Sequence, residues 1–318
     1  MNRRSECDLS RRRVLAAGLG AAGLMAFGVG RMAAAAGAAE PRSTPAEPGL
    51  FINHCHTSVK GFGAQRDRPE MGTIGALQEL LSEHPGARAI CFAPFGFEGG
   101  PWAKIGGGLD RNEWLARELR QYPQLRGFAT VYPQDHDAAG QLKRAIAGGL
   151  VGAKVHPPVM RFRLDDPAGE PFWRAAEELQ IPISIHTGTH GWNLRYYMPL
   201  LLDEIAQAHP KLPLIIEHLG GAAFFDQALA VLHNNKNCYA GLTQCSGRDP
   251  KYTLEPARRE RLLETVGPER IIYGLDYPWH KDNPQALKDD IAWIGSWGLA
   301  TEDQQKILGG NLARLIGR

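Results

Sequence analysis

Short apolar stretches recur along the chain from residue 50 onward, and each is bounded by glycine, proline or polar residues. Stretches of this length that are rich in β-branched and aromatic residues are typical of buried strands. They are "LFINHCH" from Leu50, "ARAICFAP" from Ala87, "RGFATVYP" from Arg126, "LVGAKVHPP" from Leu150, "IPISIHTGT" from Ile181, "LPLIIEHLG" from Leu212, "NCYAGLTQ" from Asn237 and "RIIYGLDYP" from Arg270. The pattern predicts eight strands.

Longer segments with apolar residues three or four apart lie between these strands and predict helices. They are "TIGALQELLSEHP", "NEWLARELRQYP", "AAGQLKRAIAGG", "EPFWRAAEELQ", "YYMPLLLDEIAQAHP", "FFDQALAVLHNN" and "PARRERLLETVG". Almost continuously apolar strands that alternate with helices indicate a parallel sheet covered on both faces. Eight of them predict an α/β fold of the (β/α)8 type, a TIM barrel. An open doubly wound sheet is the alternative, although "KIGGGLD" near Lys104 is the nearest match to its phosphate-binding turn.

The N-terminal residues follow a different pattern. The arginine cluster Arg11–Arg13 precedes a stretch of alanine, glycine and leucine, and small residues follow it. This order predicts a signal peptide over residues 1–39, and "SRRRVL" resembles the twin-arginine consensus. We therefore expect a periplasmic or otherwise exported protein whose barrel occupies residues 40–318, with no stable membrane span after cleavage. An uncleaved anchor over Val14–Gly30 is the alternative, but it is short for a span of about 20 residues.

Charge and cysteine content exclude some functions. The net charge is +2, from 36 basic and 34 acidic residues dispersed along the chain. No basic cluster in the barrel segment indicates a nucleic-acid partner or a charged membrane surface. The cysteines Cys55, Cys91, Cys238 and Cys245 have no C-x-x-C spacing, so we expect buried free thiols.

Polar residues gather at the ends of the predicted strands. The active site of a TIM barrel lies at the C-terminal ends of its strands. The residues there are His54 and His56 on the first strand, Lys154 and His156 on the fourth, His186 on the fifth, Glu217 and His218 on the sixth, and Asp276 on the eighth. One histidine at the edge of a core is usually structural, but several around one rim favour a metal site.

The spacing of the first two histidines supports that interpretation. Residues two apart on a strand point to the same face, so His54 and His56 can reach one ion while Cys55 points away. Imidazoles combined with a carboxylate suit zinc, manganese or iron rather than calcium. We predict that His54, His56, His186 and Asp276 hold one divalent ion, most simply Zn²⁺ with Mn²⁺ as the alternative. Such a set leaves a position for water.

The motifs that carry these residues resemble a known family. They are His54-Cys55-His56, "SIHTG", "EHLGG", "YGLDYPW" and the closing "ILGGNLARLIG". Together they resemble the amidohydrolase-related branch of the amidohydrolase superfamily. That branch includes aminocarboxymuconate-semialdehyde decarboxylase, other nonoxidative aryl decarboxylases, and lactonases that act on dicarboxylated or sugar lactones. The resemblance covers nearly the whole chain after the signal peptide and indicates the fold and metal site, but not the substrate.

The resemblance also implies roles. His54, His56 and His186 would bind the metal, while Asp276 would bind or approach it and accept a proton from its water. His218 would be the acid/base or electrophilic histidine beside the substrate. Members of the branch often have an acidic residue two positions before the first histidine, where this chain has Ile52. Support for His54 is therefore expected to be missing or to come from Asn53.

Other residues are candidates for the substrate pocket. Lys154 and His156 lie two apart, share a face and are expected to line it. In other branches of the superfamily a carboxylated lysine on the fourth strand bridges two metals, but here we favour a mononuclear site. Trp192 and Trp279 each follow a predicted ligand strand closely, and we expect them to form pocket walls.

These expectations lead to a functional hypothesis. A metal bound to imidazoles lowers the pKa of its water to about 7. We expect a metal-dependent hydrolase that cleaves a lactone, ester or amide bond of a small cyclic substrate. The first alternative is a nonoxidative decarboxylase of an aryl or muconate-type acid, in which His218 or Asp276 handles the proton. The second is an exported binding protein with a structural metal. A small molecule is the expected partner, and a homodimer is possible.

Overall fold

The strands of this chain form one parallel sheet. The computed structural model describes residues 49–60, 70–95, 109–280 and 282–317. The sheet order is β8-β7-β6-β5-β4-β3-β2-β1-β9. The strands are β1 (Phe51–His56), β2 (Arg88–Phe92), β3 (Leu125–Thr130), β4 (Gly152–Val155), β5 (Ile183–His186), β6 (Leu214–Glu217), β7 (Cys238–Gly241), β8 (Ile271–Ile272) and β9 (Gly274–Tyr277). Each predicted strand is present, and the eighth is divided into β8 and β9.

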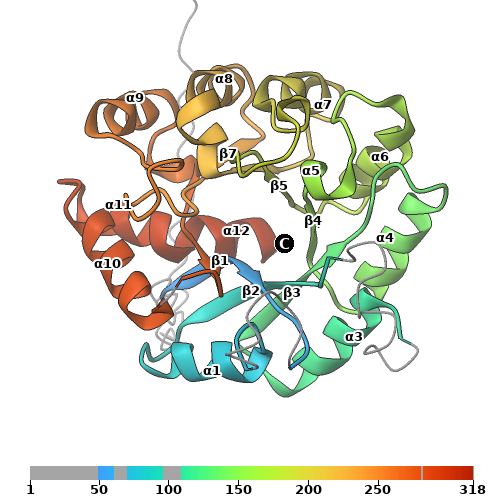
Figure 1. Ribbon diagram of the computed structural model, residues 1–318, viewed down its shortest axis with the longest axis horizontal. Coiled ribbons are helices and arrows are strands. Elements are labelled where there is room, and N and C mark those ends of the chain that lie inside the picture. The colour runs from blue at the N-terminus through green and yellow to red at the C-terminus, as the bar shows by residue number, and fades with distance from the viewer. Residues whose placement is uncertain (1–48, 61–69, 96–108, 281, 318) are drawn as a thin grey trace, which may run out of the picture. The chain divides into compact units, whose positions relative to one another are not determined.

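Helices surround the strands (Figure 1). They are α1 (Ile74–Ser82), α3 (Arg111–Glu118), α4 (Ala138–Ala147), α5 (Pro157–Met160), α6 (Glu170–Glu178), α7 (Leu202–Ala208), α8 (Gly221–Asn234), α9 (Pro256–Val266), α10 (Asn283–Gly295), α11 (Thr301–Gln305) and α12 (Asn311–Ile316), with a π-helical turn at Lys306–Gly310. The seven predicted helical segments correspond to α1, α3, α4 and α6 to α9. The TIM-barrel prediction is confirmed, and the open doubly wound sheet is excluded.

The eighth strand closes the ring of strands at Tyr273. Strand β8 pairs with β7, and β9 pairs with β1. Tyr273 lies between these two segments and donates its N–H to the carbonyl of Ile307 at 3.1 Å. Its own carbonyl accepts the N–H of Asn53, also at 3.1 Å, and its hydroxyl donates to Asp290 at 3.0 Å. The N–H of Tyr273 bonds to the C-terminal turn and not to a neighbouring strand, and this interrupts the ladder between β8 and β9.

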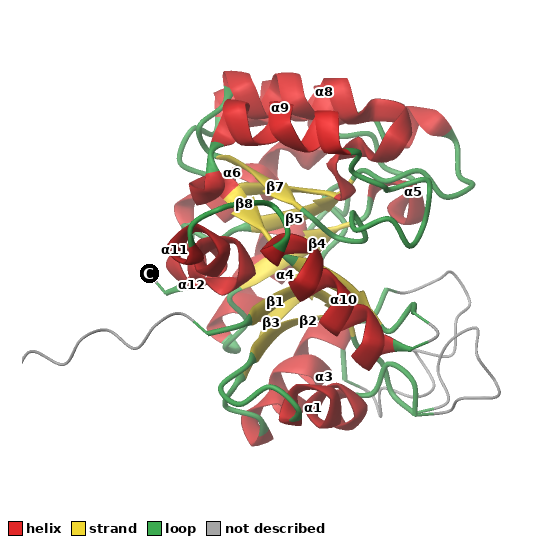
Figure 2. Ribbon diagram, turned by 90° about the vertical axis from the view of Figure 1, so that its left-hand side faces the viewer, coloured by secondary structure: helices red, strands yellow, loops and turns green. Residues whose placement is uncertain are grey.

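Two apolar layers hold the barrel together. Most core residues belong to the larger cluster, which joins the strands to the outer helices. Figure 2 shows these helices outside the strands. A smaller cluster fills the inside of the ring, where Phe51, Phe92 and Phe128 pack with Leu312 and Leu315 of α12. Helix α12 lies across the ring in Figure 1. Because apolar side chains occupy this inner space, the polar strand ends form a separate layer at the other end.

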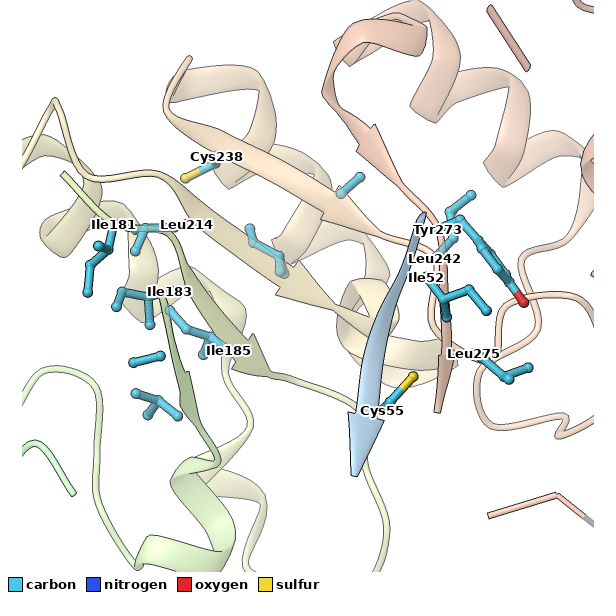
Figure 3. Close-up of a cluster of buried hydrophobic side chains, with 14 of the residues drawn as sticks. Ile52, Cys55, Ile181, Ile183, Ile185, Leu214, Cys238, Leu242, Tyr273 and Leu275 are labelled. Carbon is cyan, nitrogen blue, oxygen red and sulfur yellow. The ribbon is translucent and has the colours of Figure 1, made fainter. Parts of the chain in front are cut away.

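Strand β1 contains a bulge at the site of the two histidines. Its pairing with β2 shifts register between Ile52 and Cys55, and His54 has a left-handed φ of 66°. Ile52 and Cys55 are three positions apart, yet both point into the outer apolar layer beside Leu275 (Figure 3). The expected alternation is therefore interrupted. The bulge lets Asn53, His54 and His56 all face the inside of the barrel.

Several sequence predictions concern other parts of the chain. The predicted signal peptide at 1–39 lies outside the described residues, and the export route and the homodimer stay predictions. Among the described residues, no helix combines the length and the apolar character that a membrane crossing requires. The cysteines Cys55, Cys91, Cys238 and Cys245 are buried free thiols, as predicted.

Candidate active site

Three predicted ligands meet at the C-terminal end of the barrel. The Nε2 atoms of His54 and His56 are 3.2 Å apart. The Oδ1 atom of Asp276 lies 3.2 Å from the first and 3.3 Å from the second. We call His54, His56 and Asp276 the metal triad. Strands β1 and β9 are paired neighbours, so adjacent strand ends bring the three ligands together.

The triad fits a divalent transition metal. Two ligand atoms that are each about 2.1 Å from a tetrahedral zinc ion are roughly 3.4 Å apart, which is close to the distances seen here. Burial lowers the pKa of His54 well below its ordinary value, so its imidazole is neutral. Its Nε2 lone pair then faces an oxygen of Asp276. A cation between the two atoms removes this repulsion.

A buried carboxylate fixes the orientation of His54. The Nδ1 atom of His54 lies 3.0 Å from Oε2 of Glu217 and donates its proton there. Glu217 also accepts hydrogen bonds from Asn53 at 2.6 Å, from Ser184 at 2.7 Å and from Thr243 at 2.6 Å. With the proton held on Nδ1, the Nε2 lone pair is free for a metal. Carboxylate partners of this kind are common behind metal-binding histidines.

Lys154 is a buried cation next to the triad. Its Nζ lies 3.4 Å from Nε2 of His54 and 3.3 Å from Oγ of Ser184. It also lies 4.9 Å above the ring of Phe92, at the boundary with the apolar interior. Burial lowers the pKa of Lys154 to about 8, while Glu217 and Asp276 oppose this effect. Lys154 therefore remains mainly protonated at pH 7.

His186 belongs to a second group of histidines. Ligand-type atoms of His156, His186 and His190 lie within 4.8 Å of one another. The rings of His156 and His186 are stacked 3.9 Å apart at 9°, and Nε2 of His186 donates to the carbonyl of Gly188 at 2.5 Å. Parallel stacked rings cannot both direct an in-plane lone pair at one ion. This arrangement therefore forms a flat wall of the site rather than a second chelate.

His218 links the two groups. Its ring centroid is 5.1 Å from that of His54 and 4.6 Å from that of His186. Its Nδ1 donates to the carbonyl of Thr243 at 3.0 Å. Its Nε2 is buried and has no hydrogen-bond partner among the described residues. Burial lowers the pKa of His218 to about 4, against the opposite effect of Asp276. The free lone pair of a neutral imidazole is thus available to a substrate.

The backbone of the site is strained at four strand ends. His54, His218, Gln244 and Asp276 have φ values of 66°, 61°, 59° and 65°. Side chains other than glycine rarely adopt this left-handed conformation, and such strain is concentrated at functional sites. The surrounding hydrogen bonds hold these residues in place, which is consistent with a site built for precise placement of polar groups.

Family comparison agrees with this geometry. The sequence profile of the amidohydrolase family matches residues 54–318, a span that contains every residue of the triad and of the histidine wall. The chain belongs to the amidohydrolase family. The resemblance stated from the sequence motifs is confirmed, and this amidohydrolase is an enzyme of the amidohydrolase superfamily.

Relatives of the amidohydrolase include decarboxylases and a hydrolase. It is 24% identical over 262 residues to a gamma-resorcylate decarboxylase from Rhodococcus jostii, covering 64% of this chain and 74% of that one. A dihydroxybenzoic acid decarboxylase from Polaromonas sp., solved with manganese and 2-nitroresorcinol, has a TM-score of 0.61 at 17% identity, covering 85% and 97% of the chains. A protein assigned as a 2-pyrone-4,6-dicarboxylic acid hydrolase from Pseudomonas putida has a TM-score of 0.59 at 15% identity, covering 85% and 97%. These two solved structures have the same fold as this chain.

The structure distributes the predicted site residues unequally. His54, His56 and Asp276 form the triad, whereas His186 contacts His156 and His190 and would have to give up its bond to Gly188 to join a metal. Its ligand role stays a prediction.

The two tryptophans also differ. The ring of Trp279 lies 6.0 Å from that of His56. Trp192 is 39% exposed, and within the described ranges its indole makes no ring contact with these histidines.

The sequence patterns gave no role to three residues that contribute to the site. Glu217 was noted at a strand end without a role, and its position behind His54 depends on an interstrand contact. It is Glu217, and not a residue near Ile52, that supports His54, while Asn53 acts by holding Glu217. Thr243 and Gln244 closely follow strand β7, which has only neutral side chains. In the sequence, their place just after a predicted strand was the one feature that could have indicated a role in the site.

The metal-free amidohydrolase is expected to lose stability in acid. The pKa of His218 in the folded protein is about 4, below the ordinary value of 6.5. Between these two pH values the unfolded chain binds a proton that the folded chain does not, so stability falls as the pH decreases from 6.5 to 4. The effect of His218 alone is worth about 3 kcal/mol. Urea unfolding at a series of pH values measures it.

The matched variant for this prediction is His218→Gln, which removes the titrating group. Its unfolding free energy should decrease less steeply over the same pH interval. Asp276 keeps its charge there, because although burial alone would raise its pKa, the hydrogen bond from His56 holds that pKa well below its usual range. An equally steep decrease in both proteins would contradict the assignment to His218.

Proposed function

We propose that this amidohydrolase is a metal-dependent, nonoxidative decarboxylase of a hydroxylated aromatic carboxylic acid. Its support begins with the relatives, which include gamma-resorcylate decarboxylases and 2,6-dihydroxybenzoate decarboxylases. The pyrone hydrolase relative supports the lactone hydrolysis that the sequence first suggested. Decarboxylases are the more frequent among the relatives, and we therefore place that reaction first.

The observation that carries the proposal is the set of rings around the triad. The ring of His56 lies 5.6 Å from Phe95 and 6.0 Å from Trp279. The ring of Phe95 is also 5.5 Å from His156, and Tyr252 lies 4.8 Å from His218. Aromatic rings pack favourably edge to face or with offset faces. A flat aryl acid can therefore pack among these rings and direct its carboxylate towards the triad.

Positive charge at the base of the site suits a carboxylate. His54, His56 and Asp276 would hold a divalent cation, which would supply a Lewis-acidic charge for the substrate carboxylate. Lys154 adds a buried ammonium 3.4 Å from Nε2 of His54. Apart from His54, the close polar neighbour of this ammonium is the hydroxyl of Ser184, so its N–H groups remain available to a substrate carboxylate. Lys154 would therefore orient the acid through charge.

His218 is placed to move the proton that replaces the carboxylate. Its Nδ1 proton is engaged by Thr243, so Nε2 can accept the proton of a phenolic hydroxyl. His218 then returns this proton to the ring carbon that bears the carboxylate. The carbon–carbon bond breaks, carbon dioxide leaves, and its bonding electrons restore the aromatic ring as a phenolate. The phenolate takes a proton from water.

Incubation of the metal-loaded protein with two substrates tests the proposal. We expect 2,6-dihydroxybenzoate to release carbon dioxide and form a decarboxylated phenol, measured by gas detection and chromatography. A matched sample of 2-pyrone-4,6-dicarboxylate is expected to remain unopened. His54→Ala serves as the control, since it removes one ligand of the triad and should abolish release.

Each other outcome supports a different function. Ring opening of the pyrone without carbon dioxide release from a panel of hydroxybenzoates would favour the hydrolase. Tight metal binding with no turnover of either class would favour the exported binding protein. Release of carbon dioxide by His54→Ala at the wild-type rate would exclude the triad as the source of the activity.

A further inference from the structure

The turn that follows strand β7 contacts three functional side chains from other strands. Thr243 is fully buried, and its Oγ1 donates to Glu217 at 2.6 Å and lies 3.2 Å from Nδ1 of His54. Its carbonyl accepts the Nδ1 proton of His218 at 3.0 Å. One residue thus holds Glu217 behind Nδ1 of His54 through its hydroxyl, and holds the Nδ1 proton of His218 through its backbone carbonyl. In each of them Nε2 is the nitrogen left with a lone pair.

The next residue holds the third functional group. The side-chain amide of Gln244 donates to Oδ2 of Asp276, while Oδ1 of the same carboxylate faces His54 and His56. The two oxygens therefore have separate partners. Gln244 adopts the left-handed conformation that it shares with His54, His218 and Asp276. The strained backbone of Gln244 thus belongs to a residue whose side-chain amide bonds Asp276, a predicted metal ligand.

The neighbouring strand leaves room for this arrangement. A Cβ atom at Gly274 of β9 would clash with Oγ1 of Thr243. Any side chain at that position would displace the hydroxyl from its place between Glu217 and His54. The close approach of β9 to Thr243 is thus compatible with glycine alone.

We propose that Thr243 and Gln244 are positioning residues of the metal site. The hydroxyl of Thr243 holds Glu217 in place behind His54, and Gln244 fixes the rotation of the Asp276 carboxylate so that a single oxygen faces the histidines. The inference rests on the metal site of the proposed function but not on the reaction catalysed there. Both residues act on the site through other side chains, Thr243 through Glu217 and Gln244 through Asp276.

Metal affinity of two Thr243 variants tests the first half. Thr243→Val keeps the shape and removes the hydroxyl, whereas Thr243→Ser keeps the hydroxyl. The dissociation constant for Mn²⁺, measured from the electron paramagnetic resonance signal of the free ion, is expected to rise roughly 10-fold to 100-fold in the valine variant. The serine variant should restore it to near the wild-type value. A role in packing alone would not produce this rescue.

Gln244→Met tests the second half, because methionine has similar length and no N–H donor. We expect its dissociation constant for Mn²⁺ to rise about 10-fold. Gln285→Met is the matched control, since Gln285 lines the same cavity of about 460 Å³ but bonds Asp289 and not Asp276. Its Mn²⁺ affinity should equal that of the wild type.

The possible outcomes separate this inference from the proposed function. Wild-type Mn²⁺ affinity in both Thr243→Val and Gln244→Met, in folded protein by circular dichroism, would overturn the inference even if carbon dioxide is released. Wild-type protein that binds neither Mn²⁺ nor Zn²⁺ would overturn it too. Weakened affinity in both variants supports the inference even if no aromatic acid is decarboxylated.

Discussion

Replacing Asp276 with asparagine is expected to lower the affinity for Mn²⁺ and the rate of decarboxylation by roughly 100-fold or more. This is the upper end of the loss that removal of a residue supporting a ligand causes. The Oδ1 atom of Asp276 lies 3.2 Å and 3.3 Å from the two histidine nitrogens, and the substitution removes its charge. Metal titration and the carbon dioxide assay measure the two effects in one preparation.

Asp249→Asn provides the control for this substitution. Asp249 lines the same cavity as Gln244, but its carboxylate pairs with Lys251 at 3.1 Å rather than with the triad. Its affinity and rate should match the wild type. If Asp276→Asn binds Mn²⁺ as tightly as the wild type does, Asp276 is not a ligand.

Replacing Glu217 with leucine should reduce the free energy of unfolding of the metal-free protein by about 3–5 kcal/mol, the range found when one partner of a buried charged pair is removed. Asn53, Ser184 and Thr243 donate to this carboxylate at 2.6–2.7 Å. Leucine leaves these buried donors without an acceptor. Urea unfolding at pH 7 measures the loss.

A less disruptive variant keeps the prediction testable. Glu217→Gln retains one oxygen acceptor and is expected to cost about 1–3 kcal/mol. Glu178→Gln removes an exposed glutamate that pairs with Lys143 at 3.3 Å, and its effect should stay within about 0.5 kcal/mol. Equal stability of Glu217→Leu and Glu178→Gln would show that the carboxylate does not hold these donors together.

Strand order was predictable because it depends on local pattern. Continuous apolar runs and helical spacing indicate alternating elements, and barrel closure then places all strand ends on one rim. His54, His56 and Asp276 could be grouped from that rule alone, since the first and eighth strands become neighbours when the barrel closes. The metal triad follows from topology without any distance being known.

The details of β1 were beyond this rule. A period of two places His54 and His56 on one face, yet the strand has a bulge at His54 that also turns Asn53 inward. Bulges depend on the register of both neighbouring strands, which no single stretch of sequence contains. The stacking of His186 on His156 could not be predicted for a similar reason, because it depends on two side-chain rotations.

Neutral residues were the least predictable part of the site. Thr243 and Gln244 carry no charge and match no motif, so chemistry-based reading of the sequence passed over them. Their importance arises from hydrogen bonds to His54, His218 and Asp276. Such bonds join strands that are far apart along the chain and become visible only when the strands are placed.

The division of the eighth strand at Tyr273 has a consequence for the order of folding. Strand β1 is made first, but its partner β9 comes more than 200 residues later, and Tyr273 is bonded to Ile307 in the C-terminal turn. His54 and His56 therefore stay apart from Asp276 until almost the whole chain has been synthesised. Contacts of such long sequence separation form slowly. We therefore expect that the triad can bind a metal only after the barrel is nearly complete.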